Sequence, residues 1–355
     1  MMAARHLADS GNTEAAIDKY LMTIVKFENV KSLSELLNFI KNDDDAIMLT
    51  LMKTRQMQFA AEDDGVVLLV IEGLLLRDYV KDYHTALSYF KEREAENPGA
   101  NLYVRSLAKC YYMTGDMDNA RLYYQALSII DGSNDYRNFQ YQNGEVASLL
   151  DYYKTCNSTA DFYNYDATYY NAQASLHMLN RDWQQALDIL DTGMGRGCES
   201  LETDCYYGLA LNRLNRGDEA RPWLEKALAA GDIENDDFNP MVQVRALIEL
   251  GNTSQALVEL EKLRQHWARL NAEQAPGIPG NSNIDTYDLA CLYAQAGDSA
   301  RALELLKYHF ENDEMRYNFG LIALDWHLDG LRSLPEFQQL VAKYQNEWRS
   351  NAKAK

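Results

Sequence analysis

The chain has 355 residues, and its 53 Asp and Glu against 34 Lys and Arg give a formal net charge of −19. A field of that sign repels nucleic-acid phosphates and anionic lipid surfaces, so nucleic acid is not an expected partner. No apolar run reaches the roughly 18 residues that a membrane span needs, and no signal-peptide pattern follows Met1. With only 6 prolines and 19 glycines, the composition favours a mostly helical chain.

The N-terminal residues predict a short helix pair. Ala4 and Leu7 lie on a first helix, Gly11-Asn12 turns the chain, and Ala16 begins the apolar face of a second helix. Counted back from Ala16, the chain starts about three residues into this unit by comparison with the later units of ~34 residues. We therefore expect the first repeat to be clipped.

A second, degenerate pair is expected next. Residues 32–41 place apolar side chains on one face of a helix, and residues 46–61 form another helix that is rich in methionine. The acids at 43–45 separate the two helices. We interpret them as an N-cap and first-turn charge cluster rather than as a metal site, because carboxylates stabilise a helix N-terminus.

Clearer pairs follow at residues 65–97 and 101–130. Residues 131–165 are irregular and rich in Tyr and Asn, and they contain one distorted repeat around Gly144 to Tyr153. The pattern then returns over 166–194, 201–230, 238–263 and 284–307. The Pro/Gly-rich residues 272–283 are expected to form a loop insertion before the last pair.

A small residue recurs in the second helix of these pairs, at Ala16, Ala86, Ala120, Ala186, Ala220, Ala256 and Ala302. The intervals are 70, 34, 66, 34, 36 and 46 residues. Two intervals are near twice 34, and the last is lengthened by the loop insertion. A fixed period of about 34 residues is typical of stacked helical hairpins that touch at small side chains.

The stretch Ile284–Lys307 shows the unit most clearly, with Leu289, Ala290 and Tyr293 before Gly297-Asp298, and Ala302, Leu303, Leu305 and Leu306 after it. This order resembles the tetratricopeptide repeat (TPR). The resemblance implies an all-α, right-handed α-solenoid of about eight antiparallel helix pairs. We expect N-terminal repeats over 1–130, an irregular joint over 131–165, C-terminal repeats over 166–311 and a capping segment over 312–355.

The C-terminal segment resembles the element that closes many bacterial TPR arrays. The matching residues are Asp325, Leu328, Asp329, Leu331, Arg332, Pro335, Phe337 and Leu340. The chain has Asp325-Trp326 where that pattern usually has an Asp-Pro pair. A helix from Pro335 to Trp348 is expected to cover the last apolar face of the array.

Motifs that would indicate catalysis, a metal or a cofactor were sought and not found. The sequence has no HExxH, GxSxG or dinucleotide fingerprint and no His/Cys cluster at zinc spacing. Asp131–Asp135 begins like a calcium loop, but Tyr136 and Gln142 occupy the positions that need Gly and Glu. The five cysteines are expected to be reduced, although Cys198 and Cys205 could form a bridge. No enzyme activity, cofactor or metal is therefore expected.

Two functions stay open from the sequence. The first, which the family resemblance implies, is a non-catalytic scaffold that binds a protein or peptide in the groove of the solenoid. The second is the binding module of a longer enzyme or membrane-associated protein whose other domain lies upstream of Met1.

The family's groove positions on the first helix of each pair fall here on Arg105, Lys109, Tyr112, Asn171, Ser175, Asn212, Arg213, Arg245 and Tyr287. Four of these nine side chains are basic, which favours a partner that carries carboxylates, including a free C-terminus. An alternative of at least equal weight is that these side chains pair with neighbouring acids and only make the inner face soluble.

Overall fold

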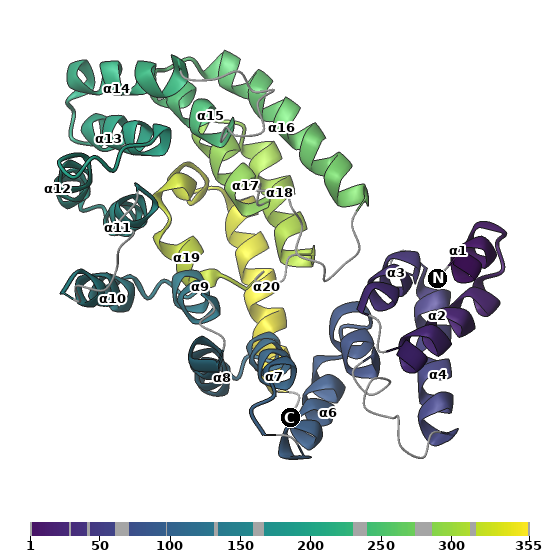
Figure 1. The fold of residues 1–355 in the computed structure, drawn as a ribbon. Helices are drawn as coiled ribbons and strands as arrows, with labels where there is room; N and C mark the ends of the chain where they lie inside the picture. Colours follow the sequence, from purple (N-terminus) through teal and green to yellow (C-terminus); the bar gives the residue numbers. More distant parts are fainter. Residues whose placement is uncertain are drawn as a thin grey trace. The chain divides into compact units, whose positions relative to one another are not determined.

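The computed structural model describes residues 2–27, 30–40, 43–60, 71–96, 98–130, 134–158, 167–229, 240–273, 286–312 and 317–353. Every regular element within those ranges is a helix, which confirms the predicted all-α fold (Figure 1). The chain forms two compact units. The first contains Met1–Tyr136, Leu270–Asn281 and Trp348–Lys355, and the second contains Arg137–Arg269 and Ser282–Glu347. The boundary lies inside the segment 131–165.

The first unit is built from successive helix pairs. Residues 71–74 are also helical and continue into η1. The elements are α1 (Met2–Asp9), α2 (Thr13–Phe27), α3 (Val30–Ile40), α4 (Asp44–Ala60), η1 (Leu75–Tyr79), α6 (Tyr83–Glu96), α7 (Asn101–Met113) and α8 (Met117–Ile130). Asp43 caps α4 as predicted, because its Oδ1 accepts the backbone N–H of Ala46 at 2.9 Å.

The second unit continues the same arrangement, and its elements are α9 (Asp135–Gln142, whose first two residues belong to the first unit), α10 (Val146–Ser158), α11 (Ala167–Leu179), α12 (Trp183–Met194), α13 (Leu201–Arg213), α14 (Gly217–Ala229), α15 (Pro240–Glu249), α16 (Thr253–Glu273), α17 (Thr286–Gln295) and α18 (Ser299–Asn312). The predicted loop at 272–283 lies outside the described residues from 274 onward.

A left-handed backbone residue ends the first helix of nearly every pair. This residue lies five positions before the recurring buried residue of the second helix, which we call the anchor. The left-handed residues are Gly11, Lys81, Gly115, Gly144, Arg181, Asn215, Gly251 and Gly297. At Gly251 the hydrogen bonds are those of a Schellman motif: its N–H donates to Ile248 O, and the N–H of Asn252 donates to Leu247 O. This shared joint sets the turn between the two helices.

The seven alanines that define the period are all fully buried, with 0% exposure at each. The first helix approaches them closely at a small residue: a Cβ added at Gly208 would come within 2.6 Å of Leu224 Cγ. The predicted register is therefore confirmed at these positions.

The pair around Gly144 keeps the joint but has a large anchor. Leu149, five residues after Gly144, donates its N–H to Glu145 O as the anchor alanines do to their own fourth-preceding residues. Because Leu149 replaces a small side chain and α9 has only 8 residues, the alanine period does not reveal this repeat. It accounts for the interval of 66 residues.

The first helix before α6 contains a π-helical turn, η1. It inserts one residue, so the close-approach glycine Gly73 lies 13 positions before Ala86, whereas Gly208 lies 12 before Ala220. A Cβ at Gly73 would come within 2.5 Å of Phe90 Cζ. Gly73 thus lets the first helix approach the second helix of its pair closely, as Gly208 does in a regular pair. Turns of the π-helical kind are common at functional positions.

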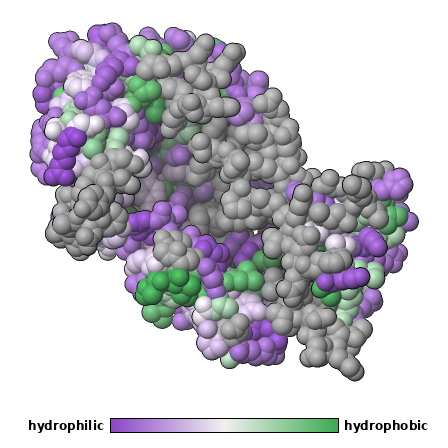
Figure 2. Space-filling view, viewed as in Figure 1, coloured by the Kyte–Doolittle hydropathy of each residue, from purple (hydrophilic) through white to green (hydrophobic). Residues whose placement is uncertain are grey.

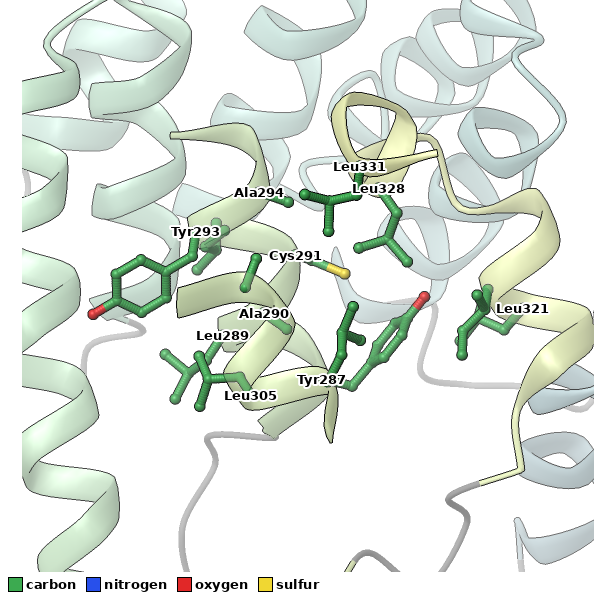
Figure 3. Close-up of a cluster of buried hydrophobic side chains, with 14 of the residues drawn as sticks. Tyr287, Leu289, Ala290, Cys291, Tyr293, Ala294, Leu305, Leu321, Leu328 and Leu331 are labelled. Atoms are coloured by element: carbon green, nitrogen blue, oxygen red, sulfur yellow. The ribbon is translucent and has the colours of Figure 1, made fainter. Parts of the chain in front are cut away.

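Three elements follow the last pair: α19 (Phe319–Leu324), the 3₁₀ helix η2 (Trp326–Leu331) and α20 (Pro335–Lys353). Helix α20 begins at Pro335, as predicted, and its Phe337 and Tyr344 pack into the apolar cluster of the second unit. The ring of Tyr344 stacks on Phe310 at 4.8 Å. Figure 3 shows the centre of this cluster, where side chains of α17 and α18 meet Leu321, Leu328 and Leu331.

Candidate functional site

Three of the predicted groove residues lie on α7 in the first unit. Arg105 forms an ion pair with Asp135, and Lys109 Nζ lies 3.0 Å from Asp78 Oδ1. Tyr112 is fully buried. Both cations thus have an acidic neighbour within their own unit.

The π-helical turn supplies the partner of Lys109. The side chain of Asp78 is only 7% exposed, and its second neighbour is Arg77, whose guanidinium also donates to Ser106 Oγ at 2.8 Å. Burial alone would raise the pKa of Asp78, but the Arg77 hydrogen bond and the Lys109 charge outweigh it, so this pKa is lowered. In this cluster of two cations and one anion, Asp78 forms an ion pair with both Arg77 and Lys109.

Tyr112 also contacts the end of the chain. The indole N–H of Trp348 donates to Tyr112 O at 3.0 Å, and the two rings lie 6.5 Å apart. Both residues belong to the first unit. A position predicted to receive a partner peptide is therefore in contact with the chain's own C-terminal helix.

In the second unit, Asn171 holds two repeats together. Its amide nitrogen donates to Ser200 Oγ and Glu202 Oε2, and its oxygen accepts from Thr203 Oγ1 at 3.0 Å. Because Asn171 is buried, these bonds to the start of α13 fix α11 against α13. Ser175 only donates back to Ala172 O, one turn earlier in α11.

Asn212 and Arg213 both bind Glu249 at the end of α15. Arg213 makes two hydrogen bonds to the carboxylate, at 2.9 and 2.7 Å, and Asn212 donates to Glu249 O and Oε2. A bidentate guanidinium–carboxylate pair has a fixed orientation. It presents the guanidinium to the Trp326 ring, whose centre is 4.7 Å away.

Arg245 on α15 is half-buried and lies over the ring of Tyr206 at 5.5 Å. Its Nε has no hydrogen-bond acceptor among the described residues. Burial lowers the pKa of Arg245, but electrostatic interactions with Tyr206 and Cys205, and then with Asp288 and Glu202, outweigh burial, so this pKa is raised. Arg245 is thus a cation with remaining hydrogen-bonding capacity.

Tyr287 on α17 binds the residue that precedes η2. Its hydroxyl donates to Asp325 Oδ2 at 3.0 Å, and Asp325 Oδ1 accepts from both the backbone N–H and Nδ1 of His327, at 3.0 and 2.5 Å. Burial would raise the pKa of Asp325, but His327 and these hydrogen bonds hold it at about 2. Asp325 is therefore ionised although it is buried.

The segment 318–332 meets the repeats at further places. Trp326 packs edge-on against Trp183 with ring centres 5.4 Å apart, and Arg181 pairs with both oxygens of Asp329 at 2.9 and 3.0 Å. At the other end, Gly320 touches the turn at Gly144 so closely that neither has room for a Cβ. In Figure 1, α19 and η2 lie beside the first helices of the second unit.

The predicted groove positions of the second unit thus include contacts with the chain itself. The sequence indicated Arg213 and Tyr287 but not Arg181 or Trp183, which bind the same segment through Asp329 and Trp326. One feature of the sequence could have indicated these contacts. The chain has Asp325-Trp326 where the family pattern has an Asp-Pro pair, and a large indole at that place needs other side chains to cover it.

None of the described cysteines is in a disulfide, so Cys198 and Cys205 are not bridged. Within the described ranges, the helices that exist are too short or too polar to cross a bilayer. Among the coloured residues of the face drawn in Figure 2, hydrophilic ones prevail, in agreement with the acidic composition.

Comparison with known proteins gives the family of the repeats. Models of the tetratricopeptide repeat match residues 76–135 and 202–226. No curated protein sequence matches the chain. Among solved structures, the chain is similar to a tetratricopeptide repeat protein from Parabacteroides merdae, at 12% identity and a TM-score of 0.34, over 88% of this chain and 98% of that one. Residues 76–135 and 202–226 thus carry tetratricopeptide repeats, and the rest of the described chain is built of similar helix pairs.

Proposed function

We propose that this protein is a non-catalytic scaffold that binds a segment of a partner protein on the first helices of its repeats. The observation that carries the proposal is the way in which segment 325–329 is held. Arg213 and Tyr287, two positions predicted to bind a peptide, instead bind Trp326 and Asp325 of the chain itself. These helix faces therefore have the chemistry to bind a polypeptide that carries aromatic and acidic side chains.

The partner is expected to use positions that the chain's own segment leaves accessible. Arg245 is the candidate in the second unit, since the residue is half-buried and no ion pair holds its guanidinium within the described part of the chain, although its Nε atom is itself buried. Arg105 in the first unit keeps an exposed fraction of 44% beside Asp135. Exposed ion pairs contribute little free energy, so a partner carboxylate can replace Asp135 at small cost.

A peptide array with acidic and neutral C-termini tests the proposal. Binding of the acidic peptides should weaken in Arg245→Ala and in Arg105→Ala, by about 10-fold or more for a charge-assisted hydrogen bond of roughly 1.5–3 kcal/mol. Lys109 is left intact, because its removal would leave buried Asp78 with one cation fewer. Arg221→Ala is the matched control, since Arg221 is exposed on α14 and pairs only with Glu225 of its own helix in the described structure.

The outcomes are distinct. Peptide binding that requires Arg245 or Arg105 and is unchanged in the Arg221 variant supports the proposal. Equal binding of acidic and neutral peptides would show that carboxylates are not what these positions recognise. If no peptide of the array binds, the proposed function itself is contradicted.

A further inference from the structure

A group of three side chains with metal-binding atoms lies where η2 meets α17. Cys291 comes from α17, while Asp325 and His327 flank the start of η2, and their ligand atoms all lie within 4.8 Å of one another. Cys291 and Asp325 are buried, and His327 is nearly so. Residues 34 positions apart supply the group, so no local zinc spacing in the sequence could show it.

We propose that Cys291, Asp325 and His327 form a binding site for a thiophilic divalent cation of the Zn²⁺ class. One sulfur, one carboxylate oxygen and one imidazole nitrogen are the ligand types that Zn²⁺ takes, whereas a thiolate is a poor ligand for Mg²⁺ or Ca²⁺. The site shares the contact between Tyr287 and Asp325 with the partner-binding positions, but its three ligands do not depend on the proposed function.

Charge balance favours a divalent ion here. Cys291 and Asp325 are 3% and 4% exposed, and the Asp325 carboxylate lies beside the Cys291 sulfur in this buried place. A divalent cation bound to one thiolate, one carboxylate and one neutral imidazole gives a group with no net charge. Such a group avoids the large desolvation penalty of an uncompensated buried ion.

The spacing of the ligands is close to what such an ion needs. The distance from Cys291 Sγ to Asp325 Oδ2 is 3.6 Å. Tetrahedral Zn²⁺, with bonds of about 2.3 Å to sulfur and about 2.0 Å to oxygen, sets the two ligand atoms roughly 3.5 Å apart. The 2.5 Å between His327 Nδ1 and Asp325 Oδ1 is a hydrogen bond, so His327 must move away slightly when the ion binds.

Binding exchanges one proton for one cation. The thiol proton of Cys291 is released to solvent as the metal–sulfur bond forms, while the proton on His327 Nδ1 moves to Nε2, so the imidazole stays neutral and Nδ1 can bind the ion. The Tyr287 hydroxyl and the backbone N–H of His327 still donate to Asp325 and keep its carboxylate oriented. The three ligands come from α17 and from the start of η2, so the ion would fasten the C-terminal segment to the last helix pair.

The test uses the full chain, freed of metal with a chelator and titrated with ZnCl₂ and separately with CoCl₂. We expect one Zn²⁺ per chain by elemental analysis after dialysis. We also expect a thiolate-to-Co²⁺ charge-transfer band in the near ultraviolet and a rise in melting temperature when Zn²⁺ is added. Both spectroscopic and stoichiometric signals should be lost in Cys291→Ser and in His327→Gln.

Two further variants separate metal binding from a general effect on folding. Cys205→Ser removes another buried thiol, whose Sγ lies 3.7 Å from Val242 O, and it should keep the full signal. Tyr287→Phe keeps all three ligands and should weaken Zn²⁺ binding by about 10- to 100-fold, as the loss of an orienting hydrogen bond does. A wild type that takes up no Zn²⁺, or a thiolate band that persists in Cys291→Ser, would overturn the site.

Discussion

The guanidinium of Arg213 lies 4.7 Å from the centre of the Trp326 ring, and Glu249 holds it there through two hydrogen bonds. The ring is 7% exposed and also meets Trp183. This arrangement fixes the 3₁₀ helix η2 against the first helices of the second unit. The contact is mainly apolar burial with a cation above it, so it should contribute strongly to stability.

Trp326→Ala should therefore lower the free energy of unfolding by about 3–5 kcal/mol, the range found for large aromatic side chains removed from cores. Asp329→Asn, which breaks the exposed pairs with Arg181 and Arg332, should lower it by less than about 1 kcal/mol. Urea denaturation followed by circular dichroism measures both. Similar losses for the two variants would show that ion pairing, and not burial of the indole, holds the segment.

The contact between Gly320 and the turn at Gly144 provides a second test. A Cβ at Gly320 would collide with the backbone oxygen of Asn143, and backbone cannot move aside as a flexible side chain can. We expect Gly320→Ala to lower the melting temperature, at a cost of roughly 1–3 kcal/mol for overpacking. In Gly330→Ala the nearest atom is Ala294 O at 3.9 Å, so this control should melt like the wild type. Equal melting of both variants would place α19 away from the turn in solution.

The alanine register is a third point of test. Ala302 is fully buried between the helices of the last pair, whereas Ala300 on the same helix is exposed. Ala302→Leu should cost roughly 1–3 kcal/mol because the added atoms have no space. Ala300→Leu has nearly the same helix propensity and should be close to neutral. An unchanged thermal melt for Ala302→Leu would contradict the register.

The sequence predicted the repeats because the buried residue of each second helix is a small alanine and the turn between the two helices of a pair is short. It located Ala302 and its six equivalents, since these positions are fully buried and recur at intervals based on about 34 residues. It described the pair around Leu149 only as distorted, because a leucine can serve as anchor once the first helix is short. The one-residue π insertion before Ala86 was also hidden, as a change of one residue is within the scatter of the intervals.

The predicted site positions show where sequence reasoning ends. Periodicity selects which side of a helix a residue occupies, and Arg213 and Tyr287 do lie on first helices beside other residues of the chain. The periodicity of the repeats cannot show that a segment more than 100 residues later, which contains Trp326, packs on Arg213. The pairing of Lys109 with Asp78 likewise depends on the π turn, which aims Asp78 at the neighbouring helix.

The last prediction concerns acid stability and the buried carboxylate of Asp78. Its pKa in the folded protein is lowered by Arg77 and Lys109 in spite of burial, from the usual 3.8. A group whose pKa is depressed by folding stabilises the folded state fully above its unfolded value. That contribution is lost as the pH falls from the usual value through the folded one. The free energy of unfolding should therefore fall steeply as the pH is lowered below about 4.

Asp78→Asn removes this titration. At neutral pH it should cost about 3–5 kcal/mol, because Arg77 and Lys109 then share a half-buried place without their anion. Below pH 4 the difference from the wild type should shrink, since the wild-type carboxyl becomes protonated there too. The control Asp118→Asn removes an exposed acid of α8 and should run nearly parallel to the wild type. Urea denaturation at several pH values measures all three proteins. A constant difference between wild type and Asp78→Asn down to the lowest pH would show that Asp78 does not gain its stabilisation by ionising between these two cations.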